Sequence, residues 1–246
     1  EITGMFSEIC NGRIIWGGTQ TIRDIRRLPM PERAIEVAFA DRYSFCAIDV
    51  ENLLKCSEKE LLRLAEGFYN DTYLMDQNAC SSPHLIVWLG NGQGVSEAKK
   101  RFWKSVYRTA AKKYALEAVS AVDKLILLYK NAIELQEVSS VSKYGNLLYV
   151  LKLDHLPNNM DDNRGECGFF YEYSAKRFDE IAPIVNEKYQ TLTYYGIAHD
   201  EIVTFVLNNK LFGIDRIVPI GLAMDISVIW DGYDLVRTLS RICDVK

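Results

Sequence analysis

The sequence predicts an α/β fold with a largely parallel sheet and helices on both of its faces. Short apolar runs alternate with segments whose apolar residues recur at helical spacing. Such alternation is typical of parallel strands joined by crossover helices. Residues 85–89, stopped by Gly90 and Gly92, are the clearest buried strand. The 246 residues, 48% of them hydrophobic, suffice for one large domain and part of another.

The predicted elements follow in chain order from this pattern. A short strand at residues 13–16 ends in two glycines, and a helical pattern follows until Pro29 stops it. The other predicted strands, each a short apolar run, are residues 34–39, 44–48, 85–89, 147–153, 169–173, 191–195 and 216–220. The other predicted helices are residues 61–73, 95–115, 117–136, 176–187 and 200–212. The first residues show no element, and the chain opens on Glu1, so we expect a piece of a longer protein.

Composition excludes several classes of function. A net charge of -4 argues against nucleic acid or an anionic membrane as a partner. The longest apolar runs are far too short for a bilayer span, so no membrane insertion is expected. Six cysteines without a CxxC pair and only three histidines indicate neither a metal site nor a disulfide framework. Reduced thiols in the cytoplasm fit best.

One cysteine lies where a nucleophile is expected. Cys80 is part of the polar segment 76–84, between a predicted helix and the apolar strand. Asn78 and Ser81 can supply hydrogen bonds and leave the sulfur accessible, whereas a packing cysteine usually has apolar neighbours. Free cysteines are more often core residues than nucleophiles, so both roles stay open from the residues alone.

His84 follows this cysteine by four residues and could suggest a catalytic dyad. If Pro83 opens the strand, however, the histidine points away from the tip of the loop. We therefore expect His84 to be a strand-end residue whose ring is bound by a backbone group.

Two further constellations could carry chemistry. Glu36 lies between Ala34 and Ala38 on one face of a predicted strand, and burial there would raise its pKa toward the range of a general acid or base. A polar residue on a solvated face is equally consistent with the pattern. The junction at residues 16–19 could receive a phosphate on its amide groups, although α/β proteins commonly contain such turns.

Several blocks together resemble a known family. Residues 76–84 with the strand after them, Ile35-Glu36, residues 41–45 and the late blocks 216–221 and 230–235 are similar to the fatty-acid reductase subunit of bacterial bioluminescence. That family is an acyl-CoA reductase branch of the aldehyde dehydrogenase superfamily. The resemblance spans nearly the whole chain but covers only the carboxyl-terminal half of the family's length.

The resemblance implies an architecture. It predicts an aldehyde-dehydrogenase-like catalytic domain with a largely parallel sheet, together with a remnant of a Rossmann-like cofactor domain. Residues 1–42 would be that remnant and residues 43–225 the catalytic domain carrying the nucleophile. Residues 226–246 would return toward the cofactor domain or an oligomer interface.

The resemblance also implies site residues. Cys80 would be the acyl-accepting nucleophile and Glu36 the general base, with Asn78 and Ser81 supporting the loop, and the Cys80 amide would form half of the oxyanion hole. The cofactor NADPH would contact the chain through the residues Trp16, Gly17, Gly18, Thr19 and Glu166. Glu166 lies near the position where the superfamily uses a glutamate on the nicotinamide ribose, although the motif around it departs from its usual form.

The implied activity is NADPH-dependent reduction of long-chain fatty acyl thioesters to fatty aldehydes through an acyl-cysteine, supplying aldehyde for bacterial luciferase. Expected partners are long-chain acyl-CoA or an acyl-enzyme, namely an acyl-protein synthetase or an acyl-transferring thioesterase, and a further copy in a homo-oligomer. The alternatives are an acyl-accepting or docking module without turnover, and a cysteine hydrolase. The hydrolase is disfavoured because no histidine is a convincing partner for Cys80.

Overall fold

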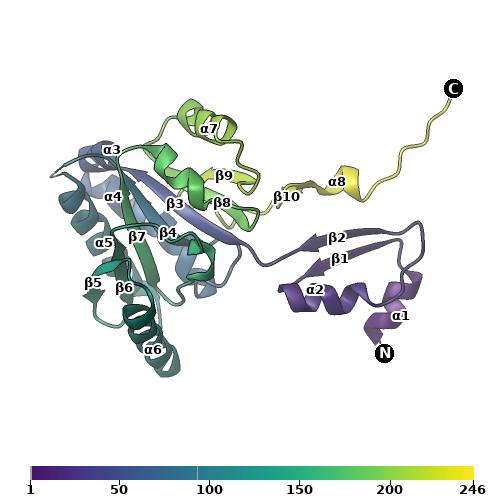
Figure 1. Ribbon diagram of the computed structural model, residues 1–246, viewed down its shortest axis with the longest axis horizontal. Coiled ribbons are helices and arrows are strands. Elements are labelled where there is room, and N and C mark those ends of the chain that lie inside the picture. The colour runs from purple at the N-terminus through teal and green to yellow at the C-terminus, as the bar shows by residue number, and fades with distance from the viewer. Residues whose placement is uncertain (1, 93) are drawn as a thin grey trace. The chain divides into compact units, whose positions relative to one another are not determined.

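The computed structural model describes residues 2–92 and 94–246, which divide into two compact units (Figure 1). The larger unit is the continuous stretch Tyr43–Asp225, and the smaller one combines the chain up to Arg42 with Ile226–Lys246. Strands and helices alternate as expected, and the predicted α/β class is confirmed. The roles assigned to these parts, cofactor remnant and catalytic domain, remain predictions.

A seven-stranded sheet forms the centre of the larger unit. Its strands are β3 (Tyr43–Asp49), β4 (Pro83–Leu89), β5 (Val138–Tyr144), β6 (Leu148–Leu153), β7 (Phe169–Ala175), β8 (Tyr189–Tyr195) and β9 (Arg216–Pro219). They lie in the order β5-β6-β7-β4-β3-β8-β9, and every neighbouring pair is parallel except β5 with β6. All seven residues of the middle strand β4 are buried, which requires cover on both faces.

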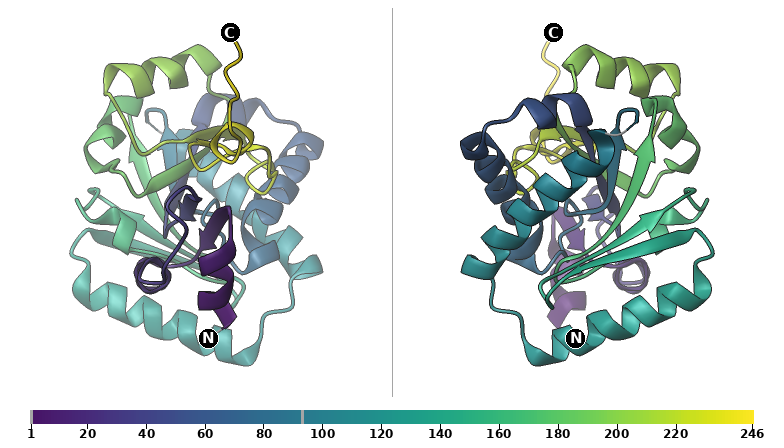
Figure 2. Two further views of the ribbon diagram at one scale, coloured as in Figure 1. Left: turned by 90° about the vertical axis from the view of Figure 1, so that its right-hand side faces the viewer. Right: turned by 90° about the vertical axis from the view of Figure 1, so that its left-hand side faces the viewer.

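Helices provide this cover on the two faces (Figure 2). They are α3 (Val50–Lys55), α4 (Glu58–Thr72) and α5 (Gly94–Lys113) on one face, and α6 (Ala118–Glu134), the 3₁₀ segment Phe178–Ile184 and α7 (His199–Asn208) on the other. Successive residues of one strand point into opposite layers. On β4, Ile86 and Trp88 pack with the first layer, whereas Leu85 and Val87 pack with the second.

The helix that leads to the cysteine has a well-defined start. Ser57 and Glu60 form a capping box at the beginning of α4, in which the Glu60 amide donates to the Ser57 hydroxyl (3.3 Å) and the Ser57 amide donates to the Glu60 carboxylate (2.8 Å). Because this end is fixed, the apolar face of α4 packs on the sheet in one register. The helix ends at Thr72, shortly before the cysteine segment.

The smaller unit contains two sheets of two strands each. Its elements are α1 (Ile2–Ile9), β1 (Gly12–Trp16), α2 (Thr19–Arg26), β2 (Ile35–Phe39), β10 (Ile229–Trp230), β11 (Tyr233–Asp234) and α8 (Leu235–Thr238). β1 and β2 pair in parallel, apart from the seven-stranded sheet. Val37, Phe39 and Trp230 form its buried apolar cluster.

Several predictions about elements were wrong, and the short elements α3, β10, β11 and α8 were not expected. A helix, α1, lies at the start of the chain, where no element was expected. The edge strand β5 was missed because most of its residues are exposed and show no apolar alternation. Residues 178–184 form a 3₁₀ helix rather than part of a long α-helix, because Pro183 lacks an amide hydrogen and clashes with the preceding turn. Among the described residues, no helix has the length and apolar character that a membrane crossing requires.

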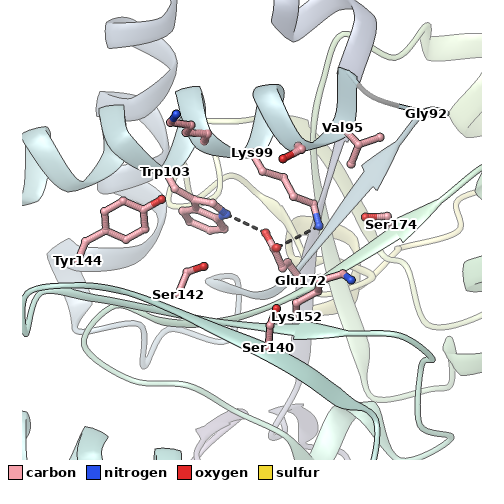
Figure 3. Close-up of a pocket in the computed structure, with 12 residues that line it drawn as sticks. Gly92, Val95, Lys99, Trp103, Ser140, Ser142, Tyr144, Lys152, Glu172 and Ser174 are labelled. Carbon is pink, nitrogen blue, oxygen red and sulfur yellow. Dashed lines mark hydrogen bonds and ion pairs between the residues drawn. The ribbon is translucent and has the colours of Figure 1, made fainter.

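A buried carboxylate joins α5 to the sheet. Glu172 of β7 accepts hydrogen bonds from the indole nitrogens of Trp88 (3.0 Å) and Trp103 (2.8 Å) and from the Lys99 ammonium (3.0 Å), as Figure 3 shows for the last two. The group lies beside a hollow of about 530 Å³, whose other side is lined by serines of β5 and by Lys152. Since the carboxylate and the ammonium neutralise one another, we interpret the cluster as structural.

Replacing Glu172 by alanine should lower the free energy of unfolding by about 3–5 kcal/mol, because two indole donors and an ammonium lose their acceptor in a largely buried place. Urea unfolding of the wild type and the variant measures this difference. Glu66→Ala is the control, because Glu66 pairs with Lys113 at the surface and its loss should cost less than about 1 kcal/mol. Equal effects of the two substitutions would contradict the interpretation.

Candidate active site

Cys80 lies in the segment between the 3₁₀ turn Tyr73–Met75 and β4, at the junction of helix and strand where the sequence places it. β3, β4 and β8 are parallel, so their amino ends meet at one edge of the sheet. The cysteine segment lies against that edge, where Ser44 of β3 and Gln190 of β8 contact Cys80. The cysteine is therefore positioned by three neighbouring strands.

The backbone and the sulfur of Cys80 are held separately. The Ser44 hydroxyl donates to the Cys80 carbonyl oxygen (2.7 Å) and accepts a hydrogen bond from the Thr191 amide (3.1 Å). The side-chain amide of Gln190 donates to the sulfur, with Nε2 and Sγ 3.5 Å apart. Cys80 as a residue is half-buried, and its sulfur has a polar donor in Gln190. An N–H donor stabilises a thiolate, the form of cysteine that attacks carbonyl groups.

The other cysteines of the larger unit differ from Cys80 in their surroundings. Cys46, Cys56 and Cys167 are all buried. Burial raises the pKa of the Cys46 thiol well above its ordinary value, which makes it a poor nucleophile. The sulfur of Cys56 lies 2.8 Å from the Tyr195 hydroxyl oxygen. Within this unit, Cys80 is the cysteine best suited to react with a substrate.

The base of the cysteine segment is fixed by a buried amide side chain. Gln77 donates from Nε2 to the carbonyl oxygens of Phe169 (2.9 Å) and Pro83 (3.3 Å), and its Oε1 accepts from the amides of Gly168 (3.1 Å) and Phe169 (3.2 Å). Asp76 and Gln77 both have positive φ, at 51° and 66°. That conformation costs roughly 1–2 kcal/mol per residue, and the hydrogen bonds of Gln77 offset it.

A second support joins α4 to the segment after β9. The Asp71 carboxylate accepts hydrogen bonds from the amides of Gly221 (2.6 Å) and Ala223 (2.9 Å), and the Asp71 carbonyl oxygen accepts one from the Ser82 hydroxyl (2.7 Å). Burial raises the pKa of Asp71 to about 6, although the two amides favour its charged form. This aspartate therefore ties the cysteine segment to residues 221–223.

His84 is a buried structural residue, as the sequence predicts. Its Nδ1 lies 3.1 Å from the carbonyl oxygen and 3.3 Å from the amide nitrogen of Gly165. Burial, with the nearby positive charge of Arg164, lowers the pKa of His84 to about 3. The imidazole is thus neutral and bound to the backbone, and it is not placed as a base for Cys80.

The two residues predicted to support the loop differ in position. Asn78 is exposed, and its backbone amide donates to the Met75 carbonyl oxygen (2.8 Å) within the turn. Ser81 is buried, and its hydroxyl lies 3.6 Å from the Met224 sulfur. Ser81 therefore belongs to the contact between the loop and the segment after β9, whereas the role of Asn78 stays a prediction.

Glu166 lies in the turn that precedes β7. It is exposed and lines a hollow of about 220 Å³, together with Arg164 and Lys124 of α6. The next amide, that of Cys167, donates to the Asp76 carbonyl oxygen (3.0 Å), so this turn is joined to the cysteine segment. The position is accessible to a ligand, and its predicted contact with the ribose stays a prediction.

The predicted phosphate contact lies in the smaller unit. Trp16, an exposed residue, ends β1, and its ring packs against that of Phe39 at a tilt of 50°. The Gly17 amide donates to the Phe39 carbonyl oxygen (3.2 Å). α2 then starts at Thr19 without a side-chain cap, and a Cβ on Gly18 would meet no atom within 4 Å. The space around Gly18 is thus open and the first turn of α2 is uncapped, and the predicted contact of these residues with cofactor phosphates stays a prediction.

Glu36, in the same unit, is engaged by two arginines. Its carboxylate accepts hydrogen bonds from Arg13 Nε (2.9 Å) on the paired strand and from Arg26 Nε (2.7 Å) of α2. Burial acts to raise the pKa of Glu36, but these bonds outweigh it and the pKa is lowered. The expectation of a raised pKa was therefore wrong. The sequence around Glu36 could not show the two arginines, because they belong to other elements that meet β2 only in the folded chain. Its role as a base stays a prediction.

Comparison with known proteins identifies the family. A family model described as acyl-CoA reductase (LuxC) matches residues 1–137, more than half of the chain and including Cys80 and Glu36. The chain belongs to the LuxC acyl-CoA reductase family. The resemblance seen in the sequence is thereby confirmed. No match was found among curated proteins.

Solved structures show that this LuxC family chain has the fold of aldehyde dehydrogenases. A 1-pyrroline-5-carboxylate dehydrogenase variant of Thermus thermophilus has a TM-score of 0.57 at 13% identity, over 96% of this chain and 51% of that one. An NAD-dependent benzaldehyde dehydrogenase of Corynebacterium glutamicum has a TM-score of 0.54 at 13% identity, and the match covers 89% of this chain and 49% of the dehydrogenase. The chain therefore spans about half the length of the structures that it matches.

Acid should destabilise the protein partly through His84. The pKa of His84 is about 3 in the folded protein and about 6.5 in the unfolded chain, so between these pH values only the unfolded chain binds a proton at this residue. The contribution of the neutral His84 to the free energy of unfolding is therefore fully present above about pH 6.5 and is lost as the pH falls. His84→Asn should therefore lose about 2 kcal/mol less free energy of unfolding than the wild type between about pH 7 and pH 5. Urea unfolding at both pH values tests this. His155→Asn, at an exposed histidine, is the control. If it reduces the pH-dependent loss of unfolding free energy as much as His84→Asn does, the role assigned to His84 is wrong.

Gln190→Met should make the Cys80 thiol less reactive near neutral pH, because it removes the amide donor to the sulfur at similar side-chain length. The pH midpoint of Cys80 alkylation by iodoacetamide should rise by about one unit, the size expected for one hydrogen bond to a charged group. Peptide mass spectrometry follows the alkylation. Gln20→Met, at an exposed glutamine of α2, is the control and should leave the midpoint unchanged. An unchanged midpoint in Gln190→Met would show that this contact does not stabilise the thiolate.

Proposed function

We propose that the protein reduces long-chain fatty acyl thioesters to fatty aldehydes with NADPH, through an acyl group carried on Cys80. The observation that supports this most directly is the arrangement at Cys80, a half-buried thiol with an amide donor at 3.5 Å on a loop fixed by Gln77 and Asp71. Membership of the LuxC acyl-CoA reductase family gives the class of substrate.

The proposed chemistry has two stages. The Cys80 thiolate attacks the carbonyl carbon of an acyl thioester, the donor thiol leaves, and a new thioester remains on the sulfur. NADPH, when bound, supplies a hydride to this carbonyl. The resulting thiohemiacetal then collapses, releasing aldehyde and the Cys80 thiolate. A cysteine suits both stages because it is a strong nucleophile and a good leaving group.

The remaining residues have assigned roles in this proposal. The Cys80 amide stabilises the oxyanion, and the amides of Gly18 and Thr19 bind cofactor phosphates, with Glu166 on the ribose. Glu36 is the proposed proton-transfer group. Because its carboxylate is paired with Arg13 and Arg26, it has to exchange these partners before it can take up a proton.

The wider setting is also part of the proposal. The acyl donor is a long-chain acyl-CoA or an acyl-enzyme such as an acyl-protein synthetase or an acyl-transferring thioesterase, and the aldehyde supplies bacterial luciferase. The proposed compartment is a reducing one such as the cytoplasm, where thiols like that of Cys80 stay reduced. Because the chain covers about half of the related structures, a second candidate is an acyl-accepting or docking module without turnover.

Incubation with a long-chain acyl-CoA should acylate Cys80 and no other cysteine, because the Gln190 amide donates to the Cys80 sulfur and the other cysteines of the larger unit are buried. Intact-protein and peptide mass spectrometry locate the thioester. Cys80→Ser should fold but form no thioester, and Cys243→Ser, at an exposed cysteine, is the matched control and should leave labelling unchanged. A stable thioester at another cysteine would overturn the assignment.

Adding NADPH to the acylated protein separates the two candidate functions. Release of fatty aldehyde supports the reductase, whereas a thioester that persists supports the acyl-accepting module. Acylation that never occurs argues against both.

A further inference from the structure

α6 carries a row of exposed apolar side chains along its outer face. Its members are Val119, Val122, Ile126, Tyr129 and Ile133, with exposed fractions between 56% and 83%. They recur at alternating intervals of three and four residues, the spacing of the a and d positions of a heptad. We call these five residues the α6 stripe. A contiguous apolar row of this kind on a surface marks an interaction site more often than an isolated exposed residue does.

The opposite face of the helix is fixed to the sheet, so the stripe cannot turn inward. Lys124, Leu128 and Asn131 are buried there. The Lys124 ammonium donates to the Cys167 carbonyl oxygen (2.8 Å), and the Asn131 side-chain amide donates to the Tyr171 hydroxyl (2.8 Å). Figure 2 shows α6 lying along one face of the sheet. One side of the helix packs on the core, and the side chains of the α6 stripe are exposed on its other side.

The spacing of the stripe favours another helix as its partner. Side chains at a and d positions interdigitate with the same pattern on a facing helix, whereas a flat surface or an extended chain does not match the repeat. A helix that carries this repeat is present in every copy of the protein, namely α6 itself. Two copies can meet through it about a two-fold axis, because an isologous contact needs only a patch that complements itself.

The charges beside the stripe are complementary in the antiparallel orientation. Asp123 and Lys130 are both exposed and lie seven residues apart, at the same heptad position on the same flank of the stripe. In an antiparallel pair that is centred between them, Asp123 of one copy faces Lys130 of the other, and the symmetric contact repeats this pairing. Within one copy, the Lys130 ammonium lies 3.9 Å from the Glu134 carboxylate on the same exposed surface, a long separation for an ion pair.

We propose that α6 is a self-association surface, through which two copies of the chain pair by an antiparallel contact between their α6 stripes. The proposal does not depend on the reductase activity. A 17-residue helix is about 25 Å long. A contact of this length buries less area than the roughly 800 Å² per partner of a typical stable interface, so the association is weak and concentration-dependent.

Sedimentation velocity over a wide range of concentration tests the proposal. The wild type should show a reversible monomer–dimer equilibrium, and the double substitution Val122→Glu with Tyr129→Glu should weaken it by about tenfold or more. Because both side chains are exposed, thermal unfolding should be unchanged, which confirms that the variant is folded. Leu207→Glu, at an exposed leucine of α7, is the control and should leave the dimer unaffected.

A charge exchange tests the antiparallel orientation. Asp123→Lys alone should weaken the dimer, because two lysines then face each other across the contact, and adding Lys130→Asp should restore it. A protein that remains monomeric at every concentration, or a dimer that the stripe substitutions leave intact, would overturn the proposal. Failure of the second substitution to restore the dimer would overturn the antiparallel arrangement.

Discussion

Burial of β4 on both faces is the constraint on which the larger unit depends. All seven of its residues are buried, so helices have to cover the sheet above and below it. A one-residue change of register would move every one of these side chains to the wrong layer. The strand is therefore held in a single position, and the start of the strand fixes where the cysteine segment meets the sheet. Packing of the core around β4 thus fixes the position of the Cys80 segment.

The loop that carries the cysteine is shaped mainly by bonds from side chains to backbone groups. Gln77, Ser44, Ser82 and Asp71 each bind main-chain atoms of a different segment. Because the partners are main-chain groups, the loop geometry depends on the paths of β3, β7 and the segment after β9. Substituting one of these four side chains should therefore affect the position of the thiol without touching it.

Local patterns in the sequence predicted most strands and helices, and they predicted that Cys80 lies between a helix and a strand. They could not show which distant residues would meet there. Gln190 follows Cys80 by 110 positions, and its amide gives no signal until β8 is placed beside β3. The pKa of Glu36 was misjudged for the same reason, since Arg13 and Arg26 come close only when β1, β2 and α2 assemble. Exposed elements such as β5 lack the apolar pattern on which such predictions rely.

The division of the chain has a consequence for the order in which the protein can form during synthesis. The apolar cluster of the smaller unit joins Val37 and Phe39 to Trp230, which the ribosome adds almost 200 residues later. The seven-stranded sheet, by contrast, is complete once β9 has emerged at Pro219. The cysteine-bearing unit can therefore acquire its core on the nascent chain while the smaller unit still waits for its last apolar partner.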